Sequence, residues 1–212
     1  EDGIRDVERS RGLGDVYKRQ LGTWSRTDIA NRLGYLAQGA PCHWPMTVER
    51  IVELGRLPHN KSWLTSDAES QNIIENTLRL TGISHLRHRV VTSLSGGERT
   101  LVMIARCLVG RAGILLADEP VTGLDPRHQI EIIECLCSRV TENTGVVIVL
   151  HDLNLAVQYC TRLILINNGR ITAEGHPKSV LTNENLSQVY GIEAAVHEID
   201  GQELVVCKDL RK

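Results

Sequence analysis

The 212-residue sequence contains no phenylalanine, and only 3% of its residues are aromatic. A hydrophobic core in this chain must therefore be aliphatic. A transmembrane helix needs about 20 consecutive apolar residues. The longest uncharged run covers residues 33–48 and is interrupted by Pro41 and Pro45. We therefore expect a soluble protein.

The chain also lacks an excess of charge of either sign. Its 24 basic and 26 acidic residues leave a net charge of −2, so nothing favours binding of nucleic acid or a polybasic membrane anchor. The six cysteines are scattered without the spacing of a zinc site or a disulfide framework. With 42% hydrophobic residues, the composition is that of a globular domain.

Residues 1–20 differ from the rest because ten of them are charged and they show almost no apolar periodicity. One interpretation is a disordered tail. The interpretation that we favour is a non-native segment, because it resembles the translated sequencing-adapter peptides that precede truncated reading frames. We therefore leave it out of the fold prediction.

From residue 21 onward, helical patterns alternate with apolar runs. Four helices are expected to begin at capping residues: Ser25, Thr47, Ser66 and Ser95. A fifth is expected over residues 126–140, and Gly55 is expected to end the second. A short strand is expected at residues 34–38, and three apolar runs predict strands at 114–117, 146–150 and 163–166. Asn168-Gly169 is expected to be a hairpin turn into residues 170–174, and Asp200-Gly201 the turn of a last hairpin. Because these runs are apolar on both faces and separated by helices, we expect a parallel sheet covered on both sides.

The sequence LSGGE at residues 94–98 predicts more than a helix start. Ser95 and Glu98 have the spacing of a capping box. Gly96 and Gly97 then stand in the first turn, where each glycine costs about 0.5–1 kcal/mol relative to alanine. We interpret them as a close approach of the backbone to a ligand, because a helix N-terminus with free amides binds phosphate.

Polar residues follow two of the predicted strands. Asp118 and Glu119 end the first of these strands, and His151 ends the next. A strand-end aspartate is where P-loop nucleotide hydrolases hold Mg²⁺, and the neighbouring glutamate could deprotonate a water. The alternative is that the acids only cap the next helix. The carboxyl ends of parallel strands bind ligands, which favours a functional site.

Together, LSGGE, LLADEP at 115–120, GLD at 123–125 and His151-Asp152, with Gln38 ahead of them, resemble the ordered motifs of the ABC-transporter ATPases. The resemblance covers residues 21–212. It implies an α/β fold with a P-loop NTPase-type parallel sheet, incomplete at its N-terminus. The ATPase domain would cover residues 21–176, with a helical subdomain at about 40–111. Residues 177–212 would add C-terminal helices and a hairpin to the same domain.

The resemblance also implies roles in binding ATP and Mg²⁺. Gln38 would contact Mg²⁺ and the attacking water and would couple the site to a membrane subunit. Asp118 would bind Mg²⁺, and Glu119 would be the general base. His151 would contact the γ-phosphate, and Asp125 would cross a dimer interface. The residues that would bind the nucleotide of the opposite subunit are those of the signature motif: Ser95, Gly96, Gly97 and Glu98.

One motif of that family is missing from the sequence. A P-loop reads GxxxxGK[S/T], and none of the five lysines follows a glycine. We therefore expect that the native gene continues upstream and that this chain hydrolyses little ATP.

The segments around residues 47–59 and 175–191 look like those of importers of iron–siderophores, haem and vitamin B12. Zinc or manganese importers and soluble ABC ATPases outside transport are the alternatives. The resemblance implies a homodimer of ATPase subunits at the cytoplasmic face of the membrane. Its partners would be integral-membrane permease subunits and, indirectly, a periplasmic or extracellular substrate-binding protein.

Overall fold

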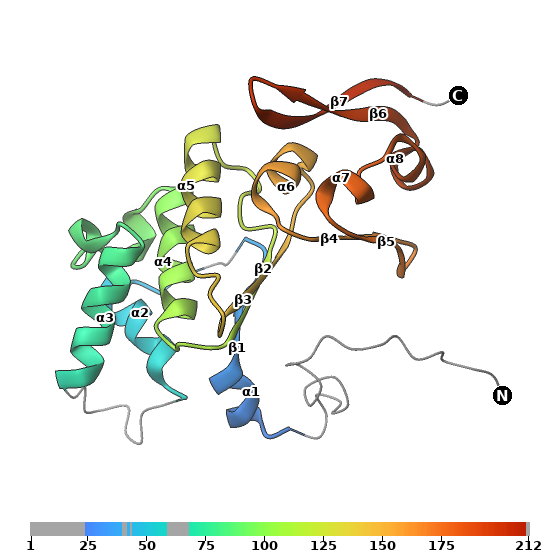
Figure 1. The fold of residues 1–212 in the computed structure, drawn as a ribbon. Coiled ribbons are helices and arrows are strands. Elements are labelled where there is room, and N and C mark those ends of the chain that lie inside the picture. Colours follow the sequence, from blue (N-terminus) through green and yellow to red (C-terminus); the bar gives the residue numbers. More distant parts are fainter. Residues whose placement is uncertain (1–23, 40–41, 43, 59–67, 211–212) are drawn as a thin grey trace.

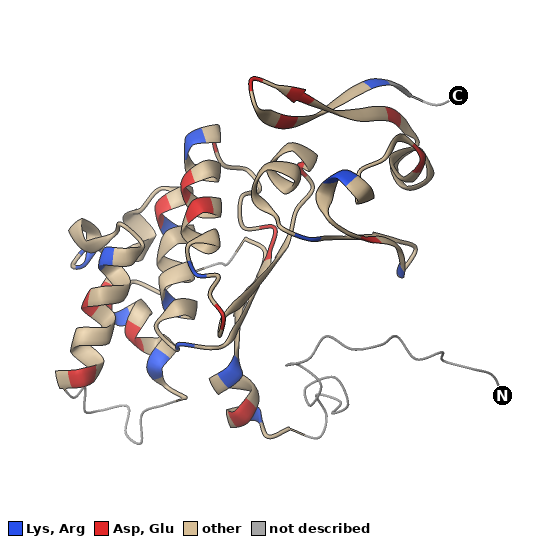
Figure 2. Ribbon diagram, viewed as in Figure 1, with Lys and Arg blue, Asp and Glu red and all other residues tan. Residues whose placement is uncertain are grey.

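The computed structural model describes residues 24–39, 42, 44–58 and 68–210 (Figure 1). The prediction for residues 1–20 lies outside the described residues, and so does that for Ser66. Among the described residues, no helix is long and apolar enough to span a membrane. Figure 2 shows acidic and basic residues interspersed on the helices at the left of the view.

A three-stranded parallel sheet lies at the centre, in the order β1-β2-β3. Its strands are β1 (Leu33–Leu36), β2 (Ile114–Asp118) and β3 (Gly145–Val149). Leu36 is in register with Ala117, and Asp118 with Val149. The carboxyl ends of all three strands therefore meet at one edge of the sheet, as the apolar runs predicted.

Helices fill the interval between β1 and β2, and one more helix precedes β1. The helix before β1 is α1 (Arg26–Arg32). The main helices between β1 and β2 are α2 (Val48–Glu53), η2 (Leu54–Arg56), α3 (Ala68–Leu80) and α4 (Gly96–Leu108). Two short 3₁₀ turns, η3 (Ser84–Leu86) and η4 (Val91–Ser93), join α3 to α4. Ser25, Thr47 and Ser95 accept the capping hydrogen bonds that were predicted for them. The boundaries of a helical subdomain, at about 40 and 111, stay a prediction.

Gly55 does not end a helix, which corrects the prediction for this residue. It lies inside η2, and it is not among the residues with a left-handed backbone. A Cβ at this position would overlap the carbonyl oxygen of Arg106 in α4. Glycine is needed here because two helical segments touch through their backbones.

The apolar run at residues 163–166 is not part of the parallel sheet, so that prediction was wrong, whereas the hairpin turn predicted at Asn168-Gly169 is confirmed. Strand β4 (Leu163–Asn167) pairs antiparallel with β5 (Arg170–Gly175) across the Asn168-Gly169 turn. An apolar run alone does not distinguish a parallel strand from a hairpin strand. The expected cover on both sides of the sheet is also incomplete, because Val147 and Val149 of β3 are 54% and 49% exposed.

The helix after β2 is α5 (Pro126–Cys137), which ends three residues before the predicted limit. The remaining elements are α6 (Leu153–Tyr159), α7 (Pro177–Val180), α8 (Asn183–Tyr190), β6 (Ile192–Ile199) and β7 (Gln202–Leu210). The last two form the predicted hairpin around Asp200 and Gly201. The main core is aliphatic, and its fully buried residues include Ile51, Ile74, Ile104 and Ile132.

Candidate functional site

The backbone makes a sharp turn where β2 ends. Asp118 is the last residue of the strand, and Glu119 follows with φ +46°. A positive φ is uncommon for a residue other than glycine and persists where the surroundings hold it. Here the Glu119 amide donates to the Val149 carbonyl at 3.2 Å. The turn is thereby tied to the end of β3, and the Glu119 side chain is directed toward residues from two other segments and toward Thr122 of the same turn.

Three side chains donate hydrogen bonds to the Glu119 carboxylate. Gln38 Nε2 lies 2.6 Å from Oε2, Thr122 Oγ1 lies 3.0 Å from the same oxygen, and His151 Nε2 lies 2.6 Å from Oε1. The Glu119 side chain is only 16% exposed, whereas that of His151 is 73% exposed. The structure thus brings together Gln38, Glu119 and His151, which the sequence analysis selected from segments far apart in the chain.

These contacts change the acidity of the carboxyl group. The hydrogen bond from His151, followed by that from Thr122, holds the pKa of Glu119 below its usual value, against the opposing effect of desolvation. Glu119 is therefore ionised at neutral pH, as acceptance of a proton from water requires.

Thr122 was missed by the sequence analysis. In the sequence, Thr122 is marked only by its place three residues after Glu119. The shape of the turn that brings the two residues together follows from the positive φ of Glu119. Tyr35 of β1 was also missed, and its hydroxyl lies 3.5 Å from Asp118 Oδ2. Both residues stand next to the selected carboxylates without carrying a recognisable motif.

Replacing Thr122 tests its contribution to this arrangement. In Thr122→Val the hydroxyl donor is lost, so we expect the pKa of Glu119 to rise, whereas Thr122→Ser keeps the donor and the low pKa. The pKa can be measured by ¹³C NMR titration of the side-chain carboxyl. A carboxylate with a lowered pKa stabilises the fold above its unfolded-state pKa. The stability difference between the Ser and Val variants should therefore disappear as the pH falls through the folded-state pKa. Identical titration curves for both variants would exclude this contribution.

The signature residues stand at the N-terminus of α4. The Glu98 amide donates to Ser95 Oγ at 3.2 Å, and the Ser95 amide donates to Glu98 Oε2 at 2.8 Å, which completes the predicted capping box. The Ser95 amide also keeps the pKa of Glu98 below its usual value. Gly96 is exposed, but Gly97 is buried, and a Cβ on Gly97 would overlap the ring of His128. The small size of Gly97 thus has a structural cause besides the close approach to a ligand that we predicted.

Asp125 is the N-cap of α5, and its Oδ1 accepts hydrogen bonds from the Arg127 and His128 amides. Within the described part of the chain, no hydrogen bond joins the signature residues to Asp118, Glu119 or His151. The predicted site residues therefore form two groups, one at the strand ends and one at the N-termini of α4 and α5.

The first group suits Mg²⁺ only when other ligands complete the coordination. Asp118 and Gln38 offer the oxygen atoms that Mg²⁺ prefers, and this ion commonly takes one or two carboxylates together with water and substrate phosphates. No cluster of three or more His, Cys, Asp or Glu that could hold a metal by itself occurs among the described residues. The donor set therefore fits an ion that arrives with a nucleotide.

Carboxylates at the carboxyl end of a parallel sheet, together with an open and capped helix N-terminus, define a nucleotide-hydrolysing α/β protein. The profile of the ABC transporter family matches residues 7–122. The match begins inside the segment that we expected to be non-native. The chain belongs to this family and is one of its transport-coupled ATP-binding proteins, with the ABC form of the P-loop NTPase fold.

Two curated relatives and one solved structure illustrate the similarity. The hemin import ATP-binding protein HmuV of Bradyrhizobium diazoefficiens is 34% identical over 97% of this chain and 78% of its own length. The ferric enterobactin transport ATP-binding protein FepC of Escherichia coli K12 is 36% identical over 86% of this chain and 69% of its own. The structure of CbiO1 from Clostridium perfringens, part of the ABC transporter complex CbiONQ, superposes with a TM-score of 0.66. The two sequences are 28% identical, and the match covers 77% of this chain and 66% of CbiO1.

Proposed function

We propose that this chain is the ATP-binding subunit of an importer for an iron–siderophore, haem or cobalamin-type substrate. The observation that carries the assignment is the convergence of Gln38 and His151 on Glu119 beside Asp118, at the ends of adjacent parallel strands. The substrate class is supported by the functions of the relatives HmuV and FepC, which are hemin import and ferric enterobactin transport.

The residues at the strand ends would act on water and on the phosphates of ATP. Asp118 and Gln38 would hold Mg²⁺, which when bound neutralises charge on the phosphate oxygens. Glu119 is ionised and would take a proton from the attacking water at its Oε atoms. Gln38 and Thr122 would orient this carboxylate, and His151 is exposed enough to leave Glu119 and donate to the γ-phosphate.

The second group would act across a subunit interface. In this proposal two copies of the chain form a dimer, and Ser95, Gly96 and Gly97 present amide and hydroxyl donors to the nucleotide of the partner subunit. Glu98 would keep that helix end in place through its capping bond. Asp125 would lie at the interface. The dimer would bind permease subunits at the cytoplasmic face of the membrane, and a substrate-binding protein would take part indirectly.

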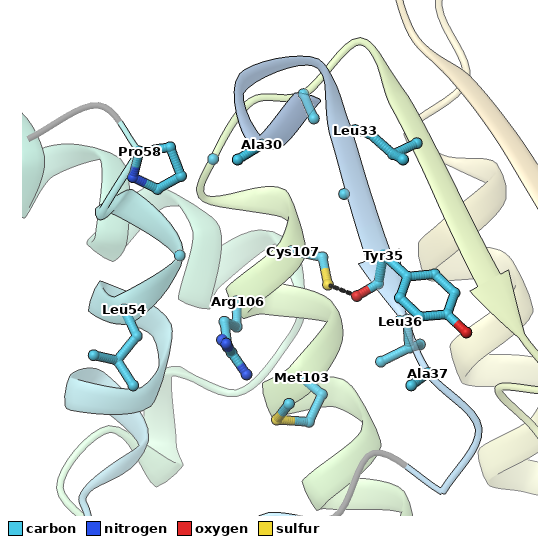
Figure 3. Close-up of a pocket in the computed structure, with 14 residues that line it drawn as sticks. Ala30, Leu33, Tyr35, Leu36, Ala37, Leu54, Pro58, Met103, Arg106 and Cys107 are labelled. Atoms are coloured by element: carbon cyan, nitrogen blue, oxygen red, sulfur yellow. Dashed lines mark hydrogen bonds between the residues drawn. The ribbon is translucent and has the colours of Figure 1, made fainter. Parts of the chain in front are cut away.

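A pocket beside Gln38 is the surface at which we expect the permease to bind. It has a volume of about 360 Å³ and is lined by β1, by Ala37, by Leu54 and Pro58, and by the C-terminal half of α4. Figure 3 shows Leu54 and Pro58 facing β1 across this pocket, with Arg106 and Met103 between them. Leu57, between the two lining residues in sequence, is 49% exposed although it is apolar.

Co-purification tests the proposal. The tagged chain is co-expressed with permeases of iron–siderophore, haem and cobalamin importers, and both proteins are recovered from detergent-solubilised membranes. We expect Leu57→Ser to reduce the recovered permease several-fold. The matched control Ile199→Ser changes a residue of similar exposure, 48%, at the end of β6 in the C-terminal hairpin (Figure 1) and should have no effect.

The substrate class is tested with the substrate-binding protein that belongs to the recovered permease. Binding of haem, a ferric siderophore or cobalamin, followed by absorbance, supports the proposal. Binding of zinc or manganese would instead show that the importer carries a metal ion and would contradict the proposed substrate class. Failure of the wild-type chain to bind any permease would reject a role in transport.

A further inference from the structure

His128 lies between two of the motifs at the proposed dimer face, and no motif includes it. It stands in the first turn of α5, three residues after Asp125, and its ring reaches the first turn of α4. A Cβ built on Gly97 would overlap His128 Cδ2 and would lie 2.8 Å from Cγ and 3.1 Å from Cβ. Because these atoms include the base of the side chain, a rotation of the ring alone does not make room for a larger residue at position 97.

The same ring holds the carboxylate of Asp125. His128 Nδ1 lies 2.5 Å from Asp125 Oδ2, while Oδ1 accepts the two backbone amides of the helix cap. A helix cap needs only the bonds to Oδ1, so the bond to Oδ2 is an additional constraint. This bond is the main reason why the pKa of Asp125 lies below its usual value. Both carboxylate oxygens are thereby fixed although the side chain is 60% exposed.

We propose that His128 is a positioning residue that fixes the Asp125 carboxylate and the Gly96-Gly97 backbone relative to each other. Through its ring, the two motifs form one rigid unit. This inference rests on the proposed function, in which both motifs face the nucleotide of the partner subunit. It explains why Gly97 is buried and small, and why a histidine, with a flat ring and a hydrogen-bonding nitrogen near its base, occupies position 128.

Two substitutions separate the two contacts of the ring. His128→Asn keeps a donor near Asp125 Oδ2 but loses most of the ring that packs on Gly97. His128→Leu fills similar space but has no donor. NMR spectra of the isotope-labelled 212-residue chain report on both contacts, through the titration of the Asp125 carboxyl and through the amide signals of Gly96 and Gly97.

In the wild-type chain we expect the Asp125 carboxyl to titrate below its usual range, and the amide signals of Gly96 and Gly97 to move with that titration. In His128→Leu the pH-dependent amide shifts should vanish and the pKa of Asp125 should rise, whereas His128→Asn should recover part of the low pKa. The control His197→Leu, in β6, should leave all of these signals unchanged. An Asp125 titration that is the same in His128→Leu and in the wild type would overturn the proposal.

A double-substitution experiment tests the packing contact independently. Gly97→Ala should lower the thermal midpoint by about 5 °C, the effect of modest overpacking in a protein of this size. In the His128→Ala background the same substitution should have little effect, because the ring that it overlaps is gone. Strictly additive effects would contradict the coupling. These measurements need neither ATP nor permease, so their failure is distinct from a failure of the proposed transport function.

Discussion

The purified 212-residue chain is expected to release phosphate from ATP no faster than its Glu119→Gln variant. P-loop proteins bind the β- and γ-phosphates through backbone amides and a lysine of the sequence GxxxxGK[S/T]. None of the five lysines of this chain follows a glycine. Loss of a single donor to developing charge commonly costs about 10²–10³-fold in rate, and here the whole cradle is missing. The ionised Glu119 then has no correctly held phosphate toward which to direct water.

Phosphate release at saturating Mg²⁺ and ATP measures this directly. The Glu119→Gln variant is the matched control because it keeps the shape of the side chain and removes the base. Equal slow release by both proteins is expected and would be ascribed to contaminants. Turnover in the wild type that the substitution abolishes would show that this chain binds and hydrolyses ATP without the P-loop sequence.

The strand-end part of the candidate site could be predicted from the sequence because it follows from topology. Asp118 and His151 come directly after apolar runs, and the carboxyl ends of neighbouring parallel strands necessarily share one edge. Gln38 lies two residues beyond β1 and reaches the same edge. Strand order and register determine the positions of such residues. Apolar runs separated by helices already indicate a parallel arrangement of the strands.

Thr122 and His128 could not be predicted in the same way. The contact of Thr122 depends on the left-handed backbone of Glu119. A glutamate in the sequence gives no indication of that backbone conformation. The contacts of His128 depend on how closely α4 and α5 pack at their N-termini. For the same reason the packing role of Gly97 against His128 could not be predicted. Contacts between helices far apart in the chain leave no periodic pattern in the sequence.

Strand β4 shows a different limit of sequence patterns. The run at residues 163–166 is as apolar as those that form the parallel sheet, yet its partner is β5. The Asn168-Gly169 turn, followed directly by residues 170–174, predicted this hairpin correctly. These local signals describe the pairing of β4 better than the apolar character of the run does.

Gly55→Ala is expected to lower the free energy of unfolding by about 3 kcal/mol, at the upper end of overpacking effects. The added Cβ would overlap the carbonyl oxygen of Arg106 and lie 2.5 Å from Val109 Cγ1. Neither is the tip of a flexible side chain, so η2 and α4 must move apart. The matched control is Gly145→Ala at the start of β3, where a Cβ meets nothing within 4 Å; this change should stay within about 0.5 kcal/mol.

Thermal and urea unfolding of the two glycine variants measure this difference, which corresponds to a loss of roughly 6–12 °C in the midpoint for Gly55→Ala. Because Gly55 and Arg106 both line the pocket beside β1, the displacement that relieves the overlap also widens that pocket. Gly55→Ala should therefore weaken recovery of the permease even at temperatures where the variant is fully folded. Equal stability of the two variants would show that η2 and α4 are not in backbone contact, and the proposed permease surface would lose one of its walls.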